Sequence, residues 1–236
     1  MIMEKFLQMI KNTSVLGVIP ARGGSKGIHK KNIKSLAGKP LIAWTIEEAK
    51  KSKYIDRLIL SSEDQEIIEV AKKWGCEVPF TRPMELAQDD SPGVETVLHA
   101  IKILPEYDFV VLLQPTSPLR SVDDIDGCLE KCIEAKANSC VSVTEADKSP
   151  FWMYYLNDQD FLEPVIKTDE NYNNRQELPK VYQLNGAVYI ANTSWLINNK
   201  SFKSIYTVAY TMPKERSFDI DNDVDFKMSE MILKSL

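Results

Sequence analysis

A glycine-rich, basic segment at residues 19–32 follows directly on an apolar stretch near the beginning of the chain. Its central residues are Ala21, Arg22, Gly23, Gly24, Ser25 and Lys26. Glycines in such a turn let backbone N–H groups approach phosphate oxygens closely. The spacing differs from both the GxxxxGK[ST] and the GxGxxG motifs, so the segment predicts a phosphate-binding loop of another kind.

The distribution of charge supports the same interpretation. No acidic residue occurs between Lys5 and Ile46, although the whole chain has a net charge of −5. A phosphate close to Arg22, Lys26 or Lys31 would gain about 4 kcal/mol per pair at an effective dielectric constant near 20, before desolvation. The alternative is a solvated basic loop, but such loops seldom combine several glycines with spaced cations directly after a buried strand. We therefore expect a small polyanion to bind here.

Two aspartates near the end of the chain, Asp219 and Asp221, are separated by one residue. We expect this segment to be a strand end, where side chains two positions apart point to the same side. Two carboxylates so placed can hold one hard cation, and Mg²⁺ prefers carboxylates together with substrate phosphates. The alternative for this short motif is a helix cap, with Asp221 preceding Asn222 at the beginning of the last helix.

Apolar periodicity predicts the elements that would position these residues. A strand at 14–20 is followed by a helix at 40–52. The pattern then recurs as strand 57–61 with helix 64–74, strand 77–80 with helix 94–104, and strand 109–114 with helix 122–135. Such alternation predicts an α/β fold in which helices cover a mainly parallel sheet.

Periodicity fails between residues 145 and about 184, in a stretch rich in Tyr, Asn, Asp and Pro that follows a predicted strand at 139–143. We interpret this stretch as an inserted arm. Strands are predicted again at 185–191 and 205–211. The closing helix, at 222–233, is expected to bury one apolar face made of Val224, Met228, Met231 and Ile232.

The cysteines and histidines offer no competing chemistry. The spacing of the four cysteines gives neither a CxxC motif nor a disulfide framework, so we expect buried thiols: Cys76, Cys128, Cys132 and Cys140. His29 lies within the basic segment and His99 within a predicted helix. Neither is expected to act in catalysis.

Composition excludes several classes of protein. With 44% hydrophobic and 27% charged residues the chain is typical of a folded globular protein. The net negative charge argues against a nucleic-acid polymer as partner. Apolar stretches fall far short of the roughly 20 residues that a membrane helix needs. Residues 1–10 lack the features of an export signal, so we expect a cytoplasmic protein that does not associate with membranes.

Several blocks of this sequence resemble the CMP-sialic acid synthetases, the N-acylneuraminate cytidylyltransferases. The blocks occur in order and span nearly the whole chain: residues 19–32, 82–87, 113–120, 175–179, 185–189 and 217–221. The resemblance implies a Rossmann-like nucleotidyltransferase whose inserted arm crosses into a two-fold partner and helps to form its sugar pocket. It implies a nucleotidyltransferase domain at 1–144 and 185–236, and a dimerisation arm at 145–184.

The resemblance also implies a role for each matching residue. Arg22, Lys26 and Lys31 would bind the triphosphate of CTP, with the backbone around Gly23, while Asn32 and Arg82 would hold the cytidine. Asp219 and Asp221 would bind Mg²⁺. The residues that would contact the sugar acid are Gln114, Arg175, Asn185 and Tyr189, and Arg175 would form a bidentate pair with its carboxylate.

The expected reaction is transfer of CMP from CTP to the anomeric hydroxyl of N-acylneuraminate or a related nonulosonic acid of the legionaminic or pseudaminic type. Two departures from the family pattern bear on recognition. Phe151 and Trp152 stand where some sialic acid enzymes carry a basic residue, and Pro92 or Gly93 stands where some relatives have a hydroxyl that contacts the base. The alternatives are a cytidylyltransferase for another keto sugar acid, such as an octulosonate, and a catalytically silent nucleotide-binding module.

Overall fold

The structure, a computed structural model, describes residues 13–168 and 174–235. Its centre is a six-stranded sheet in the order β10, β6, β9, β5, β1 and β4. In chain order these strands are β1 Val15–Pro20, β4 Arg57–Ser61, β5 Phe109–Leu112, β6 Ser139–Glu145, β9 Tyr182–Asn192 and β10 Val208–Thr211. Only β9 runs antiparallel to its neighbours within this sheet. The predicted α/β class with a mainly parallel sheet is confirmed.

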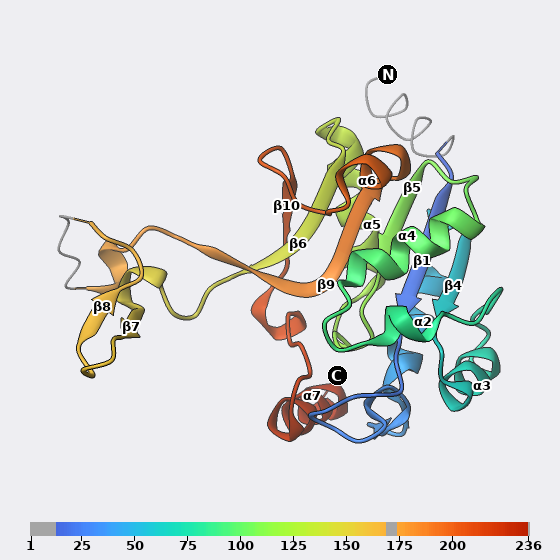
Figure 1. The fold of residues 1–236 in the computed structure, drawn as a ribbon, viewed down its shortest axis with the longest axis horizontal. Coiled ribbons are helices and arrows are strands. Elements are labelled where there is room, and N and C mark those ends of the chain that lie inside the picture. The colour runs from blue at the N-terminus through green and yellow to red at the C-terminus, as the bar shows by residue number, and fades with distance from the viewer. Residues whose placement is uncertain (1–12, 169–173, 236) are drawn as a thin grey trace.

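Helices cover both faces of this sheet (Figure 1). One face packs against α2 Leu41–Lys51, α3 Gln65–Lys73 and α5 Val122–Glu134. The other packs against α4 Gly93–Ile103 and α6 Thr193–Asn199. Side chains of β1 alternate between the two layers, because Val15 and Ile19 face the first group and Leu16 and Val18 face the second. A strand that is buried on both faces has a continuous run of apolar residues, and this run allowed β1 to be predicted from the sequence.

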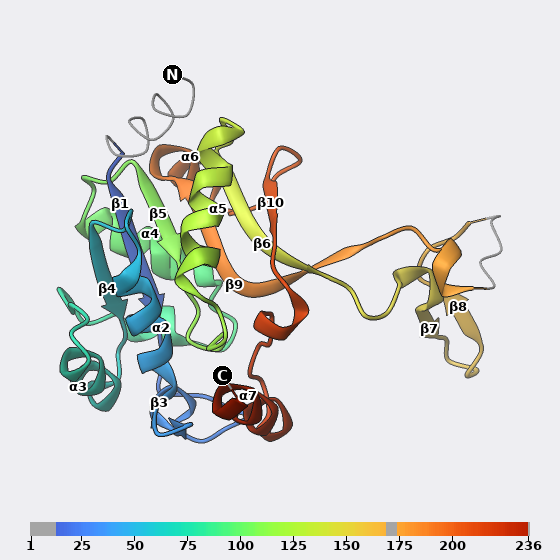
Figure 2. The same cartoon turned by 180° about the vertical axis from the view of Figure 1, so that it is seen from behind.

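The remaining elements are short or lie outside the sheet. A small antiparallel pair, β2 Ser35–Leu36 and β3 Lys39–Pro40, lies close to the last helix, α7 Asp223–Ser235 (Figure 2). The 3₁₀ turns are η1 Lys31–Ile33, η2 Met84–Ala87, η3 Pro150–Trp152, η4 Arg175–Glu177 and η5 Lys214–Arg216. No helix in the described parts of the chain is long and apolar enough to cross a membrane. Residues 1–10, where no export signal was expected, lie outside the described residues.

All four cysteines are free and buried, so their interpretation as core thiols is confirmed. They pack in the layer that contains α2, α3 and α5.

The strand predicted at residues 77–80 is wrong. Only Glu77 reaches the sheet, where it makes a single parallel bridge to Ile59 at the outer side of β4. The Leu60 amide donates to the Glu77 carbonyl at 2.8 Å. Pro79 has no N–H group with which to extend a ladder. The third repeat of the pattern therefore contributes a helix, α4, without a strand of its own.

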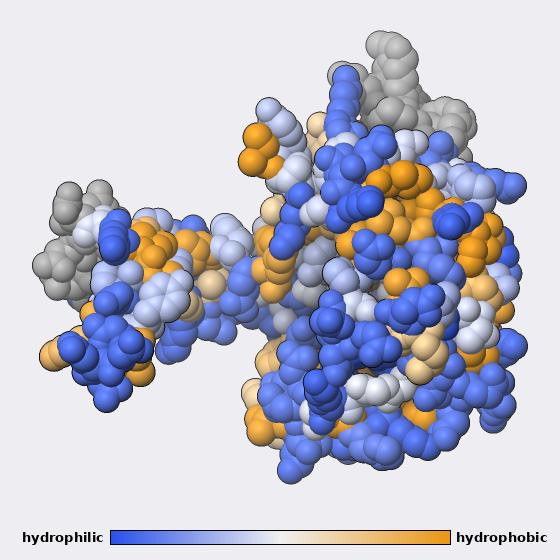
Figure 3. Space-filling view, in the orientation of Figure 1, coloured by the Kyte–Doolittle hydropathy of each residue, from blue (hydrophilic) through white to orange (hydrophobic). Residues whose placement is uncertain are grey.

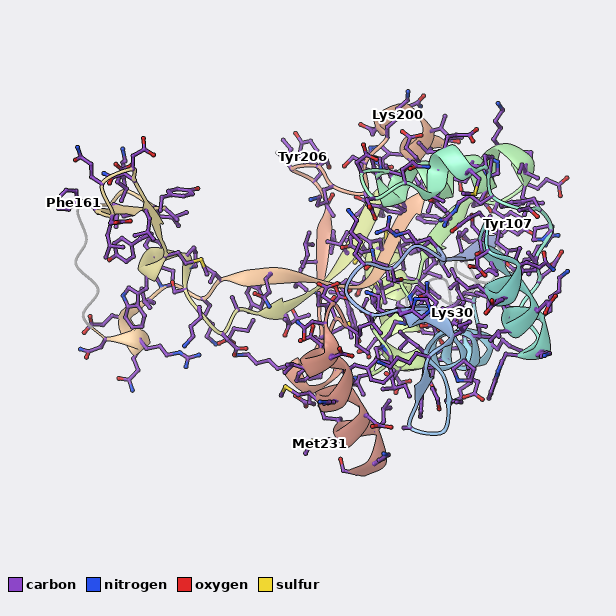
Figure 4. The ribbon with its side chains drawn as sticks, turned by 60° about the horizontal axis from the view of Figure 1, so that its bottom comes forward. Lys30, Tyr107, Phe161, Lys200, Tyr206 and Met231 are labelled. Atoms are coloured by element: carbon purple, nitrogen blue, oxygen red, sulfur yellow. The ribbon has the colours of Figure 1, made fainter. Side chains whose placement is uncertain are left out.

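The predicted apolar face of the closing helix is also wrong. Phe226 and Ser229 are buried, whereas Val224, Met228 and Met231 are exposed and Ile232 is half-buried. Met231, labelled in Figure 4, projects from the outer side of α7. The helix packs on a small cluster beside the β2–β3 pair, which Phe226 and the partly buried Leu233 both reach. Periodicity identified a helix here but selected the wrong side of it.

The segment expected to be an arm projects away from the sheet (Figures 1 and 2). Strands β6 and β9 continue as a ladder to the pair Glu145–Tyr182 and then separate. Between them lies a second antiparallel pair, β7 Tyr154–Leu156 and β8 Leu162–Pro164. Every residue of β7 and β8 is exposed.

Arg120 is a fully buried cation that joins three elements of the core. It donates to the backbone carbonyls of Gln114 and Ala187 at 3.2 and 2.7 Å, and to Thr45 Oγ1 at 2.7 Å. These partners lie after β5, on β9 and on α2. Burial lowers the pKa of Arg120 to about 10, against the opposing charge of Asp124, so the guanidinium stays protonated at neutral pH.

We expect Arg120→Met to lower the free energy of unfolding by about 3 kcal/mol or more, because it leaves the Gln114 and Ala187 carbonyls without this buried donor. Urea denaturation measures the change. Lys131→Met, which removes an exposed cation from α5, is the matched control and should change stability by no more than about 0.5 kcal/mol. Equal stabilities for the two variants would contradict this role.

Candidate functional site

A cavity of about 530 Å³ lies at the carboxyl ends of β1 and β5. Its lining includes nine of the residues that the sequence singled out: Arg22, Ser25, Lys26, Lys31, Asn32, Arg82, Gln114, Asp219 and Asp221. Carboxyl ends of parallel strands meet at one edge of a sheet, which is where open α/β sheets bind ligands. The structure therefore brings the basic loop and the aspartate pair, distant in sequence, to one space.

The glycine loop after β1 lies directly against the aspartate segment. A Cβ atom on Gly27 would stand 2.2 Å from the Asp221 carbonyl oxygen, so only glycine fits at that position. Lys31 Nζ donates to the Ile220 carbonyl at 2.6 Å and lies 3.7 Å from Asp221 Oδ1. The loop is held on its other side by Asn32, whose Nδ2 donates to the Arg22 carbonyl at 2.9 Å.

Two cations of the loop share one carboxylate. Arg22 Nη1 lies 2.7 Å from Asp89 Oδ1, and Lys26 Nζ lies 2.5 Å from Asp89 Oδ2. These contacts lower the pKa of Asp89, chiefly through its hydrogen bond with Lys26. Asp89 also lines the cavity. The sequence analysis did not identify it.

Arg82 is buried beside the glycine loop and forms an ion pair with Glu63 at 2.5 Å. The same guanidinium donates to the Ala21 carbonyl at 3.1 Å and to Thr96 Oγ1 at 3.4 Å. Glu63 in turn accepts from the Gly23 amide at 2.7 Å. Arg82 and Glu63 thus fix the backbone on both sides of Arg22.

The position of Glu63 directly after a predicted strand was a sequence signal for a site residue. Glu63 comes two residues after β4, and β4 pairs with β1, so the ends of these strands had to be close. Asp89 had a weaker signal, because it lies two residues beyond the block at 82–87 that carried the family resemblance.

Residues 217–221 form a loop and not the expected strand end. The alternative interpretation, in which Asp221 caps the last helix, is also wrong. Asn222 is the cap, since its Oδ1 accepts from the amides of Val224 and Asp225 at 2.8 and 3.1 Å. The Asp225 carboxylate accepts in return from the Asn222 amide at 3.1 Å. The Asp221 carboxylate therefore serves no capping function.

Both aspartates are exposed, and the Asp221 side chain is 79% exposed. Partial desolvation by the surrounding protein raises the pKa of Asp219, the hydrogen bond from Thr116 lowers it, and the charge of Asp221 raises it further. Gly186 on β9, with φ of +74°, makes room for this arrangement. A Cβ atom there would stand 2.9 Å from Gln114 Oε1 and 3.4 Å from Asp219 Oδ2.

The donor set fits Mg²⁺. Carboxylate oxygens are its preferred protein ligands, and it commonly takes one or two of them together with substrate phosphates and water. A carboxylate of raised pKa, such as that of Asp219, gains from a nearby cation, because the cation favours its ionised form. Within residues 13–168 and 174–235 no group of three or more His, Cys, Asp and Glu side chains could hold a metal ion, so any metal here would depend on the aspartate pair.

The family model described as cytidylyltransferase matches residues 16–232. The chain belongs to the cytidylyltransferase family. It is 35% identical over 218 residues to the N-acylneuraminate cytidylyltransferase of Escherichia coli O18:K1:H7, covering 92% of this chain and 51% of that protein. This cytidylyltransferase therefore spans about half the length of its Escherichia coli relative.

Two further relatives match it along nearly their whole length. The pseudaminic acid cytidylyltransferase of Campylobacter jejuni is 36% identical over 225 residues, covering 93% of this chain and 96% of that protein. The CMP-N,N′-diacetyllegionaminic acid synthase of Legionella pneumophila is 36% identical over 227 residues, with the same coverage of both chains.

A solved structure of CMP:2-keto-3-deoxy-manno-octonic acid synthetase complexed with CTP has a TM-score of 0.72 to this chain. The match covers 94% of this chain and 99% of that one at 15% identity. That likeness shows a shared fold.

The structure does not bring every predicted residue of this cytidylyltransferase to the cavity. Arg175 lies on the arm, in a second cavity of about 450 Å³ that also contains Lys148 and Trp152. Asn185 is buried, accepts from Ser142 Oγ at 2.6 Å and donates to Ser217 Oγ at 2.9 Å.

The remaining predicted positions also lie outside the lining of the first cavity. Tyr189 is half-buried on β9 and packs against Phe202, with ring centroids 5.7 Å apart. Ala21 is buried, and its amide donates to the Ser61 carbonyl at 3.0 Å. Gly23 gives its amide to Glu63. Gly24 faces open space, since a Cβ atom at that position would meet nothing within 4 Å.

We expect Asp219→Asn to raise the melting temperature of the metal-free protein at neutral pH only slightly, by about 1 °C, because the residue is exposed and solvent screens its charge. The folded-state pKa of Asp219 is raised above the ordinary 3.8, so its ionised form opposes folding at neutral pH. That opposition disappears as the pH falls through the raised pKa. The gain should therefore shrink at acidic pH.

Thermal unfolding in EDTA, from neutral to acidic pH, measures this effect. Asp221→Asn is the control, because its exposed side chain should leave the melting temperature nearly unchanged. A lower melting temperature for Asp219→Asn would contradict the expectation.

Proposed function

We propose that this cytidylyltransferase transfers CMP from CTP to the anomeric hydroxyl of a nonulosonic acid and releases pyrophosphate. The observation that carries the proposal is the cavity in which the cations of the glycine loop face the Asp219–Asp221 pair. A metal-bound triphosphate needs cations for its phosphates and carboxylates for its metal ion within one cavity. The names of three relatives, which specify N-acylneuraminate, pseudaminic acid and N,N′-diacetyllegionaminic acid, support the sugar class.

On the nucleotide side, the glycine loop would receive the triphosphate. Arg22, Lys26 and Lys31 supply positive charge along it, and the backbone at Gly24 and Ser25 is open to close approach. Asn32 and Arg82 border the same cavity and are assigned to the cytidine. Both are buried and hydrogen-bonded to the loop backbone, so they also fix its shape.

The sugar hydroxyl would attack the α-phosphorus in line with the departing pyrophosphate, forming a C–O–P bond as the P–O bond to the β-phosphate breaks. Mg²⁺ would neutralise phosphate charge and lower the pKa of the attacking hydroxyl. Asp219 and Asp221 would hold that ion. Lys26 and Arg22 would stabilise the charge that builds on the leaving pyrophosphate.

On the sugar side, Gln114 borders the cavity, whereas Arg175 lies on the projecting arm. We propose that the protein is a homodimer in which the arm of one copy completes the sugar site of the other. The arm exposes many large apolar side chains, some visible as patches in Figure 3, and such a surface is typical of an interface. They are Trp152, Met153, Tyr154, Tyr155, Leu156, Phe161, Leu162 and Val165.

The test of this function is pyrophosphate release from CTP and a panel of nonulosonic and octulosonic acids, with and without EDTA. Product should form with at least one nonulosonic acid and stop in EDTA. Turnover of octulosonic acids alone would support the octulosonate alternative, and no turnover of any acid would support the silent module. We also propose a cytoplasmic location, which the four free thiols support.

We expect Lys26→Ala to reduce kcat by about 10²-fold or more while changing the KM for CTP less. The reason is that charge on pyrophosphate builds as the bond breaks, so the contact strengthens in the transition state. Steady-state kinetics with CTP varied measure this split. Lys30→Ala is the matched control, since Lys30 pairs with Glu66 and does not line the cavity. A change confined to KM would overturn this role for Lys26.

We expect a preference for a nonulosonic acid of the legionaminic or pseudaminic type over N-acetylneuraminic acid. Trp152 and Met153 line the cavity that contains Arg175. Some sialic acid enzymes carry a basic residue at the position of Phe151 and Trp152. A methyl-ended sugar tail would bury apolar surface against Trp152 and Met153, and one such methyl changes kcat/KM by about 10- to 200-fold. Measurement of kcat/KM for both sugars at saturating CTP tests this preference, and equal values would refute it.

A further inference from the structure

The Asp89 carboxylate bridges two of the cations that line the first cavity, Arg22 and Lys26. Its two oxygens contact different partners, Oδ1 with Arg22 at 2.7 Å and Oδ2 with Lys26 at 2.5 Å. A carboxylate in this position offers the same two acceptors, at the same kind of spacing, as a phosphate group. The neighbouring Asp90 is exposed and does not line the cavity.

We propose that Asp89 is a displaceable counterion of the glycine loop, which the triphosphate of CTP must replace and which returns as pyrophosphate leaves. The proposal rests on the proposed function, because that function assigns Arg22 and Lys26 to the triphosphate. The donors that Asp89 engages, at Arg22 Nη1 and Lys26 Nζ, are not available to phosphate oxygens while these contacts last, and the negative charge of Asp89 opposes a bound phosphate. Asp89 therefore weakens nucleotide binding and sets the affinity of the site for its substrate and its product.

The surroundings of Asp89 allow such an exchange. Its side chain is 44% exposed, and the side chains of Arg22 and Lys26 are 33% and 78% exposed, so water can solvate all three groups when they separate. Exposed ion pairs of this kind are weak, which makes them easy to replace by a more highly charged anion.

The backbone around Asp89 is held without the help of its carboxylate. Ser91 Oγ donates to the Glu85 carbonyl at 3.0 Å, and Gln88 Nε2 donates to the Met84 carbonyl at 2.9 Å. The Ser91 amide donates to the Gln88 carbonyl at 3.3 Å. The turn can therefore keep its shape while the Asp89 side chain rotates away, and replacement of the carboxylate should not unfold it.

The charge balance of the glycine loop indicates how this exchange would help pyrophosphate to leave. In the described ion pairs of the loop, Arg22 and Lys26 contact Asp89, and Lys31 contacts Asp221. Without Asp89, the positive charge of Arg22 and Lys26 would therefore face pyrophosphate without a carboxylate to balance it. Strong retention of pyrophosphate would slow each turnover. A carboxylate that can reoccupy Arg22 and Lys26 competes with the product and favours its release.

The experiment compares Asp89→Asn with Asp90→Asn, which removes the same charge one residue away. Isothermal titration calorimetry measures the dissociation constants of inorganic pyrophosphate and of CTP, each with Mg²⁺, for both variants and the wild-type protein. Asp89→Asn should bind both ligands about 3- to 30-fold more tightly, and the gain should shrink as ionic strength rises. Asp90→Asn should bind both as the wild-type protein does. Asp89→Ala, measured in parallel, should repeat the result of Asp89→Asn.

Other outcomes overturn the proposal. Weaker binding by Asp89→Asn would show that Asp89 contacts the bound nucleotide or its metal ion, and unchanged binding would show that it does not compete. An equal gain in both variants would reveal an effect of net charge alone. Failure of the proposed function is distinguishable, because pyrophosphate binding tests the cation pair without cytidine: a protein that binds pyrophosphate but not CTP would refute the function and leave this comparison valid.

Discussion

The contact between the glycine loop and residues 220–221 is the one on which the site depends. Gly27 approaches the Asp221 carbonyl so closely that no other residue fits, and Lys31 donates to the Ile220 carbonyl. These contacts join segments about 190 residues apart in the chain. Together with the hydrogen bond from the Ile220 amide to the Thr116 carbonyl at 2.8 Å, they hold the loop cations and the aspartate carboxylates at one cavity. Neither group alone forms a site for a metal-bound triphosphate.

The sheet makes that contact possible. Strand β1 is buried on both faces and ends at Pro20, so the loop that follows begins from a fixed point. Strand β9 enters between β5 and β6 in the antiparallel sense, which places Gly186 beside Gln114 and Asp219. The same strand carries the chain back from the arm. One strand thus connects the end of the sheet that borders the first cavity with the segment that bears Arg175.

Features encoded locally could be predicted from the sequence, and features decided by distant packing could not. The glycine loop and the strand before it were evident because spacing and charge lie within one segment. The strand expected at 77–80 failed because a single bridge to Ile59 gives no ladder. The exposed face of α7 was misassigned because periodicity cannot tell which side meets the core. Glu63 and Asp89 were missed because their partners, on the loop after β1, are remote in sequence.

Two carboxylate–cation contacts beside the loop differ in a way that suits their different positions. The pair Glu63–Arg82 is almost completely buried, with side chains 8% and 4% exposed, and it is tied to the backbone at Ala21 and Gly23. Separating buried charges is strongly unfavourable, so this pair is permanent and fixes the shape of the loop. The Asp89 contacts are partly exposed to solvent, where one anion can replace another at little cost. The loop therefore combines a rigid backbone with cations whose partner can change, which is what a site must offer if it is to bind a triphosphate and then release pyrophosphate.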